Sequence, residues 1–251
     1  MKGAPVPEGA PQQFPDEERD LERLELLSMM SQDAAAFIPR QLLEKTLFYY
    51  EQLKLLKDVP GDIVEFGAHR GTFLCVLNDL AALVDAPSPF RDILGFDTFS
   101  GFPASNQMSQ AARTDRSFYA AGSANDTSVR LVNRKLEERP GHRVQLIAGD
   151  VFETLPRTLA EWPNKIALAI CDLDAGSVTK FVLEQIWERL SPGGLICFDE
   201  YSRNGWSETT GVDAFFKERG LSLALLKKGP RAPAAYVRIS DDILARAAVS
   251  R

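Results

Sequence analysis

Short apolar runs alternate with amphipathic stretches over most of the chain from residue 62 onward. Such runs are typical of strands buried on both faces, and the stretches between them repeat apolar residues at helical spacing. This alternation predicts a parallel sheet with helices on both faces. Strands are expected at 62–66, 92–97, 143–150, 165–172 and 194–200, and helices at 71–84, 152–162, 177–190 and 208–219.

Two further apolar runs, 221–227 and 232–240, complete the pattern. Only a few residues separate them, and these include Gly229 and Pro230. A parallel crossover needs about a dozen residues or more, so the last two strands should be antiparallel. The predicted fold class is therefore a doubly wound, Rossmann-like α/β sheet with an antiparallel terminal strand.

The first sixty residues follow a different pattern. Residues 1–15 hold four prolines and two glycines, which predicts a flexible arm. Helical periodicity begins at Asp16, and a second helical run spans about 39–57. We expect an arm at 1–15, N-terminal helices at 16–60 and the sheet domain at 61–251. The apolar faces of the two helices favour packing between subunits, which predicts a homo-oligomer.

A polar insertion, 104–142, interrupts the sheet pattern and is too long for a plain connection. We interpret 104–125 as a lid over the ligand site, although a disordered surface loop would have a similar composition. The charge pattern of 126–139 predicts a helix that caps the sheet.

Each of the five parallel strands ends in carboxylates. In an open α/β sheet, ligands bind beyond the carboxyl ends of the strands, where the strand order reverses. A single Asp or Glu there would be an ordinary capping residue, but a set at five successive ends indicates a ligand site. These residues are Glu65, Asp97, Asp150, the pair Asp172 and Asp174, and the pair Asp199 and Glu200.

The loop after the first strand has the pattern G-x-x-x-G, from Gly67 to Gly71. It lacks the middle glycine that brings backbone close to a pyrophosphate in dinucleotide-binding folds. The loop therefore favours a ligand that carries a cation and an amino acid. Asp97 is placed to accept ribose hydroxyls, and Asp150 to accept from an adenine amino group.

Five motifs together resemble those of class I S-adenosylmethionine-dependent methyltransferases, and more narrowly the macrocin O-methyltransferase (TylF/MycF-like) family. They are VEFGAHRGTF (64–73), GFDTFSGFP (95–103), GDVFETLP (149–156), ICDLDAGSVTK (170–180) and LSPGGLICFDEY (190–201), in the family's order. The chain departs from the family's pattern at 176–178, and Glu200 stands in place of the second Asp of an acidic pair. The cofactor-binding residues that the resemblance implies are Glu65, Phe66, Gly67, Ala68, Thr72, Asp97, Thr98, Ser100, Asp150, Val151 and Asp172.

The resemblance also implies a divalent metal, Mg²⁺ first. Strands that end at Asp172 and at Asp199 should be neighbours about 4.8 Å apart, so Asp172, Asp199 and Glu200 would converge. Crowded carboxylates need protons, basic partners or a hard cation. The alternative is that Asp199 and Glu200 only cap the next loop. Asp172, or failing that Asp174, would take the proton from the acceptor hydroxyl.

The predicted function is a metal-dependent S-adenosylmethionine O-methyltransferase of antibiotic biosynthesis that acts on a hydroxyl of a deoxysugar or similar small polyol. Candidate substrate-side residues are Asp174, Tyr201, Trp206 and Glu208. Three alternatives stay open: a phenolic or other non-sugar acceptor, a catalytically silent cofactor-binding partner protein, and a nicotinamide-dependent oxidoreductase. Against the last, the chain has no G-x-G-x-x-G and no Tyr-x-x-x-Lys pair.

Composition limits the partners and the setting. The formal net charge is −6, which disfavours binding to nucleic acids and anionic membranes. No apolar run approaches the roughly 18 residues of a spanning helix. Three widely spaced cysteines in apolar runs predict buried free thiols in a reducing compartment, and so a cytoplasmic protein. Neither histidine, His69 or His142, has an obvious acid partner in the sequence.

Overall fold

The computed structural model describes residues 32–33, 36, 38–85, 91–102, 124–137, 139, 143–203 and 207–249. The chain divides into two compact units, Met1–Leu43 and Glu44–Arg251. The second unit carries the sheet, and helix α2 (Arg40–Leu55) buries Tyr49 and Leu53 in its core. The predicted arm at 1–15 and the helix from Asp16 lie outside the described residues.

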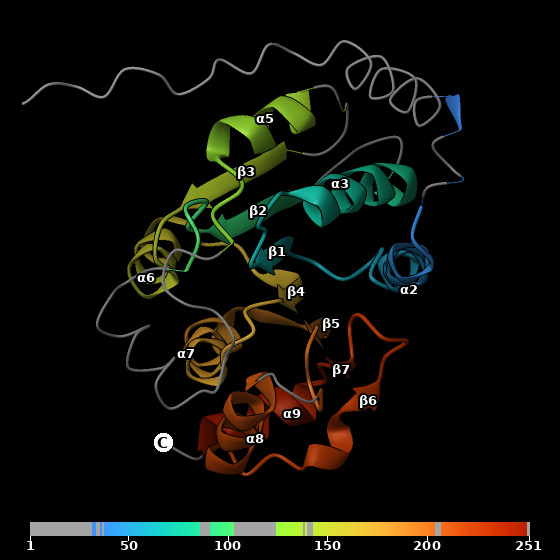
Figure 1. Cartoon of the computed structure of the whole chain (residues 1–251). Helices are drawn as coiled ribbons and strands as arrows, with labels where there is room; N and C mark the ends of the chain where they lie inside the picture. The colour runs from blue at the N-terminus through green and yellow to red at the C-terminus, as the bar shows by residue number, and fades with distance from the viewer. Residues whose placement is uncertain are drawn as a thin grey trace, which may run out of the picture. The chain divides into compact units, whose positions relative to one another are not determined.

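The strands of the described residues form a single sheet of seven, in the order β3-β2-β1-β4-β5-β7-β6 (Figure 1). The first five strands are parallel, and β7 is antiparallel to both β5 and β6. The predicted doubly wound fold and its antiparallel terminal pair are confirmed. The strands are β1 (Asp62–Phe66), β2 (Asp92–Asp97), β3 (Arg143–Ala148), β4 (Ile166–Cys171), β5 (Leu190–Phe198), β6 (Lys227–Lys228) and β7 (Ala235–Arg238).

Helices cover both faces of this sheet, with α3 on the opposite side from α6 and α7 (Figure 1). Alternation along β1 turns Val64 and Phe66 toward the core beneath α6 and α7, and Glu65 toward the other face. The helices that follow α2 are α3 (Thr72–Asp85), α5 (Val129–Glu137), α6 (Val151–Glu161), α7 (Gly176–Ile186), α8 (Glu208–Glu218) and α9 (Asp241–Val249).

The C-terminal segment differs from the prediction. The strand expected at 221–227 is reduced to Lys227–Lys228, and Leu223–Leu225 form a 3₁₀ turn instead. Ser222 favours the turn, because its side chain accepts a hydrogen bond from the Ala224 N–H at 3.2 Å. Helix α9 was not predicted, although Ser240 followed by two aspartates is a typical helix start.

Other sequence expectations can be compared directly with the fold. Helix α5 confirms the predicted helix within 126–139. Cys75, Cys171 and Cys197 are buried and free, as predicted. Every helix in the described ranges is too short or too polar to cross a membrane. The predicted lid at 104–125 lies almost wholly outside the described residues.

The register of the central strands places their carboxyl ends level. Phe66 at the end of β1 pairs with Cys171 of β4, and Cys171 pairs with Phe198 of β5. The backbone N–H of Asp172 donates to Phe66 O at 2.9 Å, and that of Asp199 donates to Cys171 O at 3.0 Å. The residues that follow these strands therefore meet where the strand order reverses between β1 and β4.

Candidate active site

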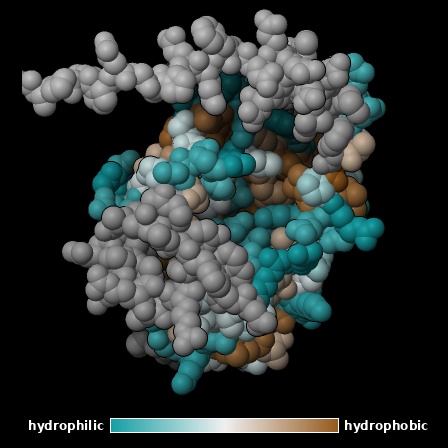
Figure 2. Space-filling view, in the orientation of Figure 1, coloured by the Kyte–Doolittle hydropathy of each residue, from teal (hydrophilic) through white to brown (hydrophobic). Residues whose placement is uncertain are grey.

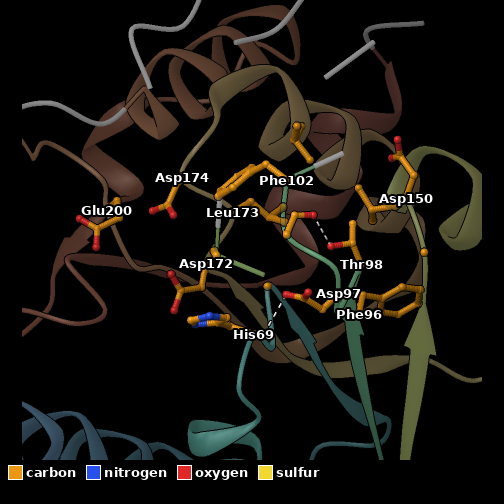
Figure 3. A pocket seen from close by; sticks show the side chains of 16 residues that line it. His69, Phe96, Asp97, Thr98, Phe102, Asp150, Asp172, Leu173, Asp174 and Glu200 are labelled. Atoms are coloured by element: carbon orange, nitrogen blue, oxygen red, sulfur yellow. Dashed lines mark hydrogen bonds between the residues drawn. The ribbon is translucent and has the colours of Figure 1, made fainter. Parts of the chain in front are cut away.

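A pocket of about 350 Å³ opens at this carboxyl edge (Figure 3), and we call it the acidic pocket. Its lining includes five carboxylates and no lysine or arginine. Asp172, Asp174 and Glu200 lie on one side of it, and Asp97, Thr98 and Asp150 lie on the other (Figure 3). The lining residues are Gly67, His69, Phe96, Asp97, Thr98, Gly101, Phe102, Ala124, Gly149, Asp150, Val151, Asp172, Leu173, Asp174, Val178 and Glu200.

The carboxylate of Asp97 is held by two backbone groups. The N–H of His69 donates to its Oδ2 at 2.8 Å, and the N–H of Phe99 donates to its Oδ1 at 2.7 Å. Both donors have positive φ angles, which curl the loops after β1 and β2 around the side chain. Each carboxylate oxygen has a second acceptor site, so the fixed Asp97 can still accept ligand hydroxyls.

Asp150 both caps a helix and lines the acidic pocket. It is the N-cap of α6, and its side chain accepts from the N–H of Phe152 at 3.0 Å. The structure therefore confirms that it caps a helix, and it also places the residue in the pocket lining beside Val151.

Gly67 brings the loop after β1 against the end of β4. Its φ is +93°, and a Cβ there would lie 1.9 Å from the backbone oxygen of Asp172. No side chain fits at this position, so glycine is required for the floor of the pocket to close.

The other proposed cofactor residues divide into two groups. Gly67, Asp97, Thr98, Asp150, Val151 and Asp172 line the pocket. Glu65, Phe66, Ala68, Thr72 and Ser100 do not. Phe66 is fully buried and stacks on Phe96 beneath the pocket, because strand alternation turns it into the core. Thr72 and Ser100 are exposed to solvent.

Lys45 is the functional candidate that the sequence did not reveal. This residue of α2 places Nζ 2.9 Å from Oδ1 of Asp199 and 3.3 Å from Oδ2 of Asp172. The ammonium also lies over the ring of Phe73, 4.5 Å from its centroid. Burial lowers the pKa of Lys45, but attraction to Asp172 and Asp199 outweighs burial and raises the pKa above its usual value. Lys45 is therefore a permanent cation between two strand-end carboxylates.

One ammonium does not balance the surrounding carboxylates. Burial raises the pKa of Glu65 to about 8, and Asp172 and Asp199 add to the effect. Burial raises the pKa of Asp174 to about 8, helped by Asp172 and Glu200. Burial and the neighbouring Asp172 also raise the pKa of Asp199 despite its contact with Lys45. These raised pKa values show that carboxylates are crowded at this edge of the sheet, so the site favours either bound protons or a cationic ligand.

The carboxylates predicted to hold a metal have protein cations as partners. Lys45 contacts two of them, and Nη1 of Arg203 donates to both oxygens of Glu200, each at 2.8 Å. In the described part of the chain, no three Asp, Glu, His or Cys side chains are placed to hold one ion. The arrangement as it stands does not fit a three-carboxylate metal centre. Lys45 and Arg203 supply part of the charge compensation that the sequence led us to assign to Mg²⁺.

Comparison with known proteins decides the family. A family model described as macrocin O-methyltransferase (TylF) matches residues 31–227. The chain belongs to the macrocin O-methyltransferase family. The match contains all five motifs on which the resemblance was based, and so confirms it.

Two curated relatives are named as O-methyltransferases, and the name of one includes a rhamnosyl group. Mycinamicin III 3''-O-methyltransferase of Micromonospora griseorubida is 28% identical over 148 residues, 57% of this chain and 56% of the relative. The 8-demethyl-8-(2,3-dimethoxy-alpha-L-rhamnosyl)-tetracenomycin-C 4'-O-methyltransferase of Streptomyces olivaceus is 28% identical over 159 residues, 62% and 59% of the two chains. The match thus spans less than two thirds of either relative's length.

Solved structures extend the likeness over nearly the whole chain. The crystal structure of CalS11, a calicheamicin methyltransferase, is 30% identical with a TM-score of 0.70, over 95% of this chain and all of that one. An apo structure of CalS11, described as a TDP-rhamnose 3'-O-methyltransferase of calicheamicin biosynthesis, has a TM-score of 0.63 over 92% and 97%.

The substrate-side candidates of this macrocin O-methyltransferase homologue have different surroundings. Asp174 lines the acidic pocket. The hydroxyl of Tyr201 donates to Asp213 at 2.8 Å, outside that pocket. Glu208 is fully buried and accepts from the N–H of Glu200 at 3.2 Å, so it anchors the turn after β5. Trp206 lies outside the described residues.

His69 has an acid partner after all. Its Nε2 lies 2.8 Å from Oδ1 of Asp126, which also pairs with Arg70. The expectation of no partner was wrong, because Asp126 is far away in sequence and reaches the pocket rim only through the fold. The sequence likewise carries no signal for Lys45, since a lysine on a helix is ordinarily a solvated residue.

Proposed function

We propose that this chain transfers a methyl group from S-adenosylmethionine to a sugar hydroxyl in natural-product biosynthesis. The observation that carries the proposal is the acidic pocket of a member of the macrocin O-methyltransferase family. Its five strand-end carboxylates outnumber the two cations that pair with them among the described residues, Lys45 and Arg203. Such a lining is electrostatically complementary to a sulfonium cation. The names of the relatives include glycosides and a TDP-sugar as acceptors, and both remain candidates here.

The two sides of the pocket suggest separate tasks. Asp97 and Asp150, held by backbone donors, would accept from the ribose hydroxyls and the adenine amino group. The loop at Gly67 would lie against the amino-acid end of the cofactor. The cofactor supplies a methyl group on a positively charged sulfur, and the pocket supplies position and a matching field. Asp172, Asp174 and Glu200 face the remaining space, where an acceptor hydroxyl would enter.

Asp172 is the proposed proton acceptor. Its carboxylate lines the pocket and contacts Lys45, which fixes one of its oxygens. The other carboxylate oxygen is then available to take the proton from the acceptor hydroxyl as the hydroxyl oxygen attacks the methyl group. The bond between that methyl group and the cofactor sulfur breaks in the same step, and S-adenosylhomocysteine leaves. Asp174 is the alternative base, and its left-handed backbone (φ 63°) points to a tightly specified turn.

Metal dependence remains a prediction from the family resemblance, and no step above uses a metal. A divalent ion at Asp172 and Asp199 would have to displace the ammonium of Lys45 or bind beside it. Methyl transfer by protein treated with EDTA, measured with and without added Mg²⁺, tests the prediction. A full rate without metal would contradict it.

The homo-oligomer also remains a prediction. Leu47 and Leu55 of α2 and Leu83 of α3 are exposed, and hydrophobic surface appears on the side where these helices lie (Figure 2). Sedimentation of the full chain would test it, and a monomer at all concentrations would contradict it.

Calorimetric binding of S-adenosylhomocysteine tests the core of the proposal. We expect binding by the full chain, and about tenfold weaker binding by Asp97→Asn, because a charge-assisted acceptor is lost. Asp92→Asn is the matched control, since it lies at the opposite end of the same strand and pairs with Arg143. Mass spectrometry of a rhamnosyl acceptor should show a gain of one methyl group. Absence of binding, or binding of NADH instead, would overturn the proposal, and binding without transfer would favour a silent partner protein.

A further inference from the structure

A second depression lies on the same side of the sheet, between the turn after β5 and the β6–β7 hairpin. It has a volume of about 530 Å³. Four lysines and arginines contribute to its lining, and no Asp or Glu does. We call it the basic pocket. Its lining residues are Tyr201, Ser202, Arg203, Leu226, Lys227, Lys228, Gly229, Pro230, Arg231, Ala234 and Ala235.

The pairing of the strands puts this hairpin at the carboxyl edge. Ala235 at the start of β7 pairs with Phe198 at the end of β5 and with Lys228 at the end of β6. The N–H of Ala234 donates to Phe198 O at 2.9 Å, which ties the hairpin loop to the end of β5. The loop from Gly229 to Ala234 therefore lies on the edge that carries the acidic pocket.

A short stretch of backbone connects the two pockets. Glu200 lines the acidic pocket, and the next three residues line the basic pocket. Arg203 holds both oxygens of Glu200 through Nη1, and its Nη2 donates to the backbone oxygen of Arg231 at 2.6 Å. A ligand that spans the two pockets would pass this link.

The basic pocket is lined by positive charge, whereas the chain as a whole has a negative net charge. The formal net charge is −6, yet the lining includes Arg203, Lys227, Lys228 and Arg231. Lys227 and Lys228 are exposed, and neither has an ion-pair partner among the described residues. Clustered lysines and arginines in a concave site favour an anion, and phosphate oxygens suit both side chains.

We propose that the basic pocket binds the phosphate groups of a sugar nucleotide whose sugar hydroxyl enters the acidic pocket. The inference rests on the proposed function and narrows its acceptor to a sugar that still carries its nucleoside diphosphate. In a sugar nucleotide, one sugar ring carries both the reacting hydroxyl and the anomeric phosphate. The two pockets are linked by the turn from Glu200 to Arg203, so such a ligand could place its hydroxyl in one pocket and its phosphates in the other. A neutral glycoside offers the basic pocket no anion.

The test measures binding of TDP and of inorganic pyrophosphate by calorimetry. The variant is the double change Lys227→Gln with Lys228→Gln, and the control is Lys57→Gln with Lys217→Gln, which removes the same charge from exposed sites outside both pockets. We expect the full chain to bind TDP, the variant to bind it at least about tenfold more weakly, and the control to bind it as before. Added salt should weaken TDP binding.

Kinetics with TDP-rhamnose distinguish the proposed phosphate site from the proposed methyltransferase function on which it rests. The variant should raise KM for TDP-rhamnose at unchanged kcat, and leave the affinity for S-adenosylhomocysteine unchanged. If neither phosphate probe binds, or both double variants bind TDP equally, the basic pocket is not a phosphate site. If the chain then methylates a neutral rhamnoside, the proposed function stands and only this inference fails. Absence of S-adenosylhomocysteine binding would remove the proposed function itself.

Discussion

The acidic and basic pockets share one edge of the sheet and have opposite charge. The first is lined by five carboxylates without a lysine or arginine, and the second by four cationic side chains without a carboxylate. The acidic lining comes from parallel strands, whose carboxyl ends coincide by topology. Most of the basic lining comes from an antiparallel hairpin added at the side, and Arg203 comes from the turn after β5. This difference suggests that the parallel strands serve the cofactor and the reacting hydroxyl, and that the hairpin serves the rest of the acceptor.

The largest expected effect follows from Asp172→Asn, which removes the proposed base from the acidic pocket. We expect kcat to fall about 10²–10⁴-fold, because the acceptor hydroxyl loses its proton acceptor. Asp174→Asn is the comparison, and it should reduce kcat less. Single-turnover methyl transfer gives both values. The reverse order would move the base to Asp174, and unchanged rates in both variants would leave the acidic pocket without a proton acceptor.

Lys45→Met tests whether the ammonium of Lys45 compensates the negative charge of Asp172 and Asp199. Removal of one partner of a buried ion pair leaves uncompensated charge, and costs about 3–5 kcal/mol in similar cases. We expect a lower free energy of unfolding and, in the folded variant, tighter binding of Mn²⁺ because no ammonium competes for Asp172 and Asp199.

Denaturant unfolding and Mn²⁺ titration give the two readouts for Lys45. Lys54→Met is the control, since Lys54 of the same helix makes only an exposed pair with Glu51. If Mn²⁺ affinity stays the same or falls, Lys45 and a metal do not compete for this space.

Arg203→Gln removes the side chain that links the two pockets. It should lower the free energy of unfolding less than Lys45→Met does. The side chain is partly exposed, so the loss of its bonds to Glu200 and to the Arg231 backbone should cost about 1 kcal/mol. We expect KM for TDP-rhamnose to rise while the affinity for S-adenosylhomocysteine is unchanged. Arg157→Gln, on the exposed side of α6, is the control. Equal effects of the two changes on KM would show that the pockets are independent.

The two pockets also differ in how far the sequence predicts them. Asp97, Asp150 and Asp172 were predicted because each follows an apolar run, and parallel strands bring such ends together whatever the details. Lys45 could not be predicted, because it contacts Asp172 across 127 positions of sequence and only tertiary packing brings them together. The metal expectation followed from counting carboxylates without knowing where the cations of the chain would lie.

The basic pocket escaped prediction for a different reason. The apolar run 221–227 suggested a full strand, whereas the chain forms a 3₁₀ turn and only a two-residue strand, Lys227–Lys228. Its position beside Arg203 depends on the register of β7 against β5. Register in an added hairpin depends on side-chain packing that periodicity does not reveal.

The last expected effect is on the pH dependence of stability and concerns Glu65, beneath the acidic pocket. Burial raises its pKa to about 8 in the folded chain, and its Oε2 has no hydrogen-bond partner in the described residues. The folded state therefore binds a proton that the unfolded state releases near its ordinary pKa. This contribution to stability is complete at acid pH and is lost as the pH rises through about 8.

Glu65→Gln should keep a neutral side chain at every pH, and so flatten the decline in Tm between mildly acid pH and pH 8. Glu51→Gln, at an exposed site of α2, should leave the profile as it is. An equally steep decline in Glu65→Gln would show that a group other than Glu65 causes the pH dependence.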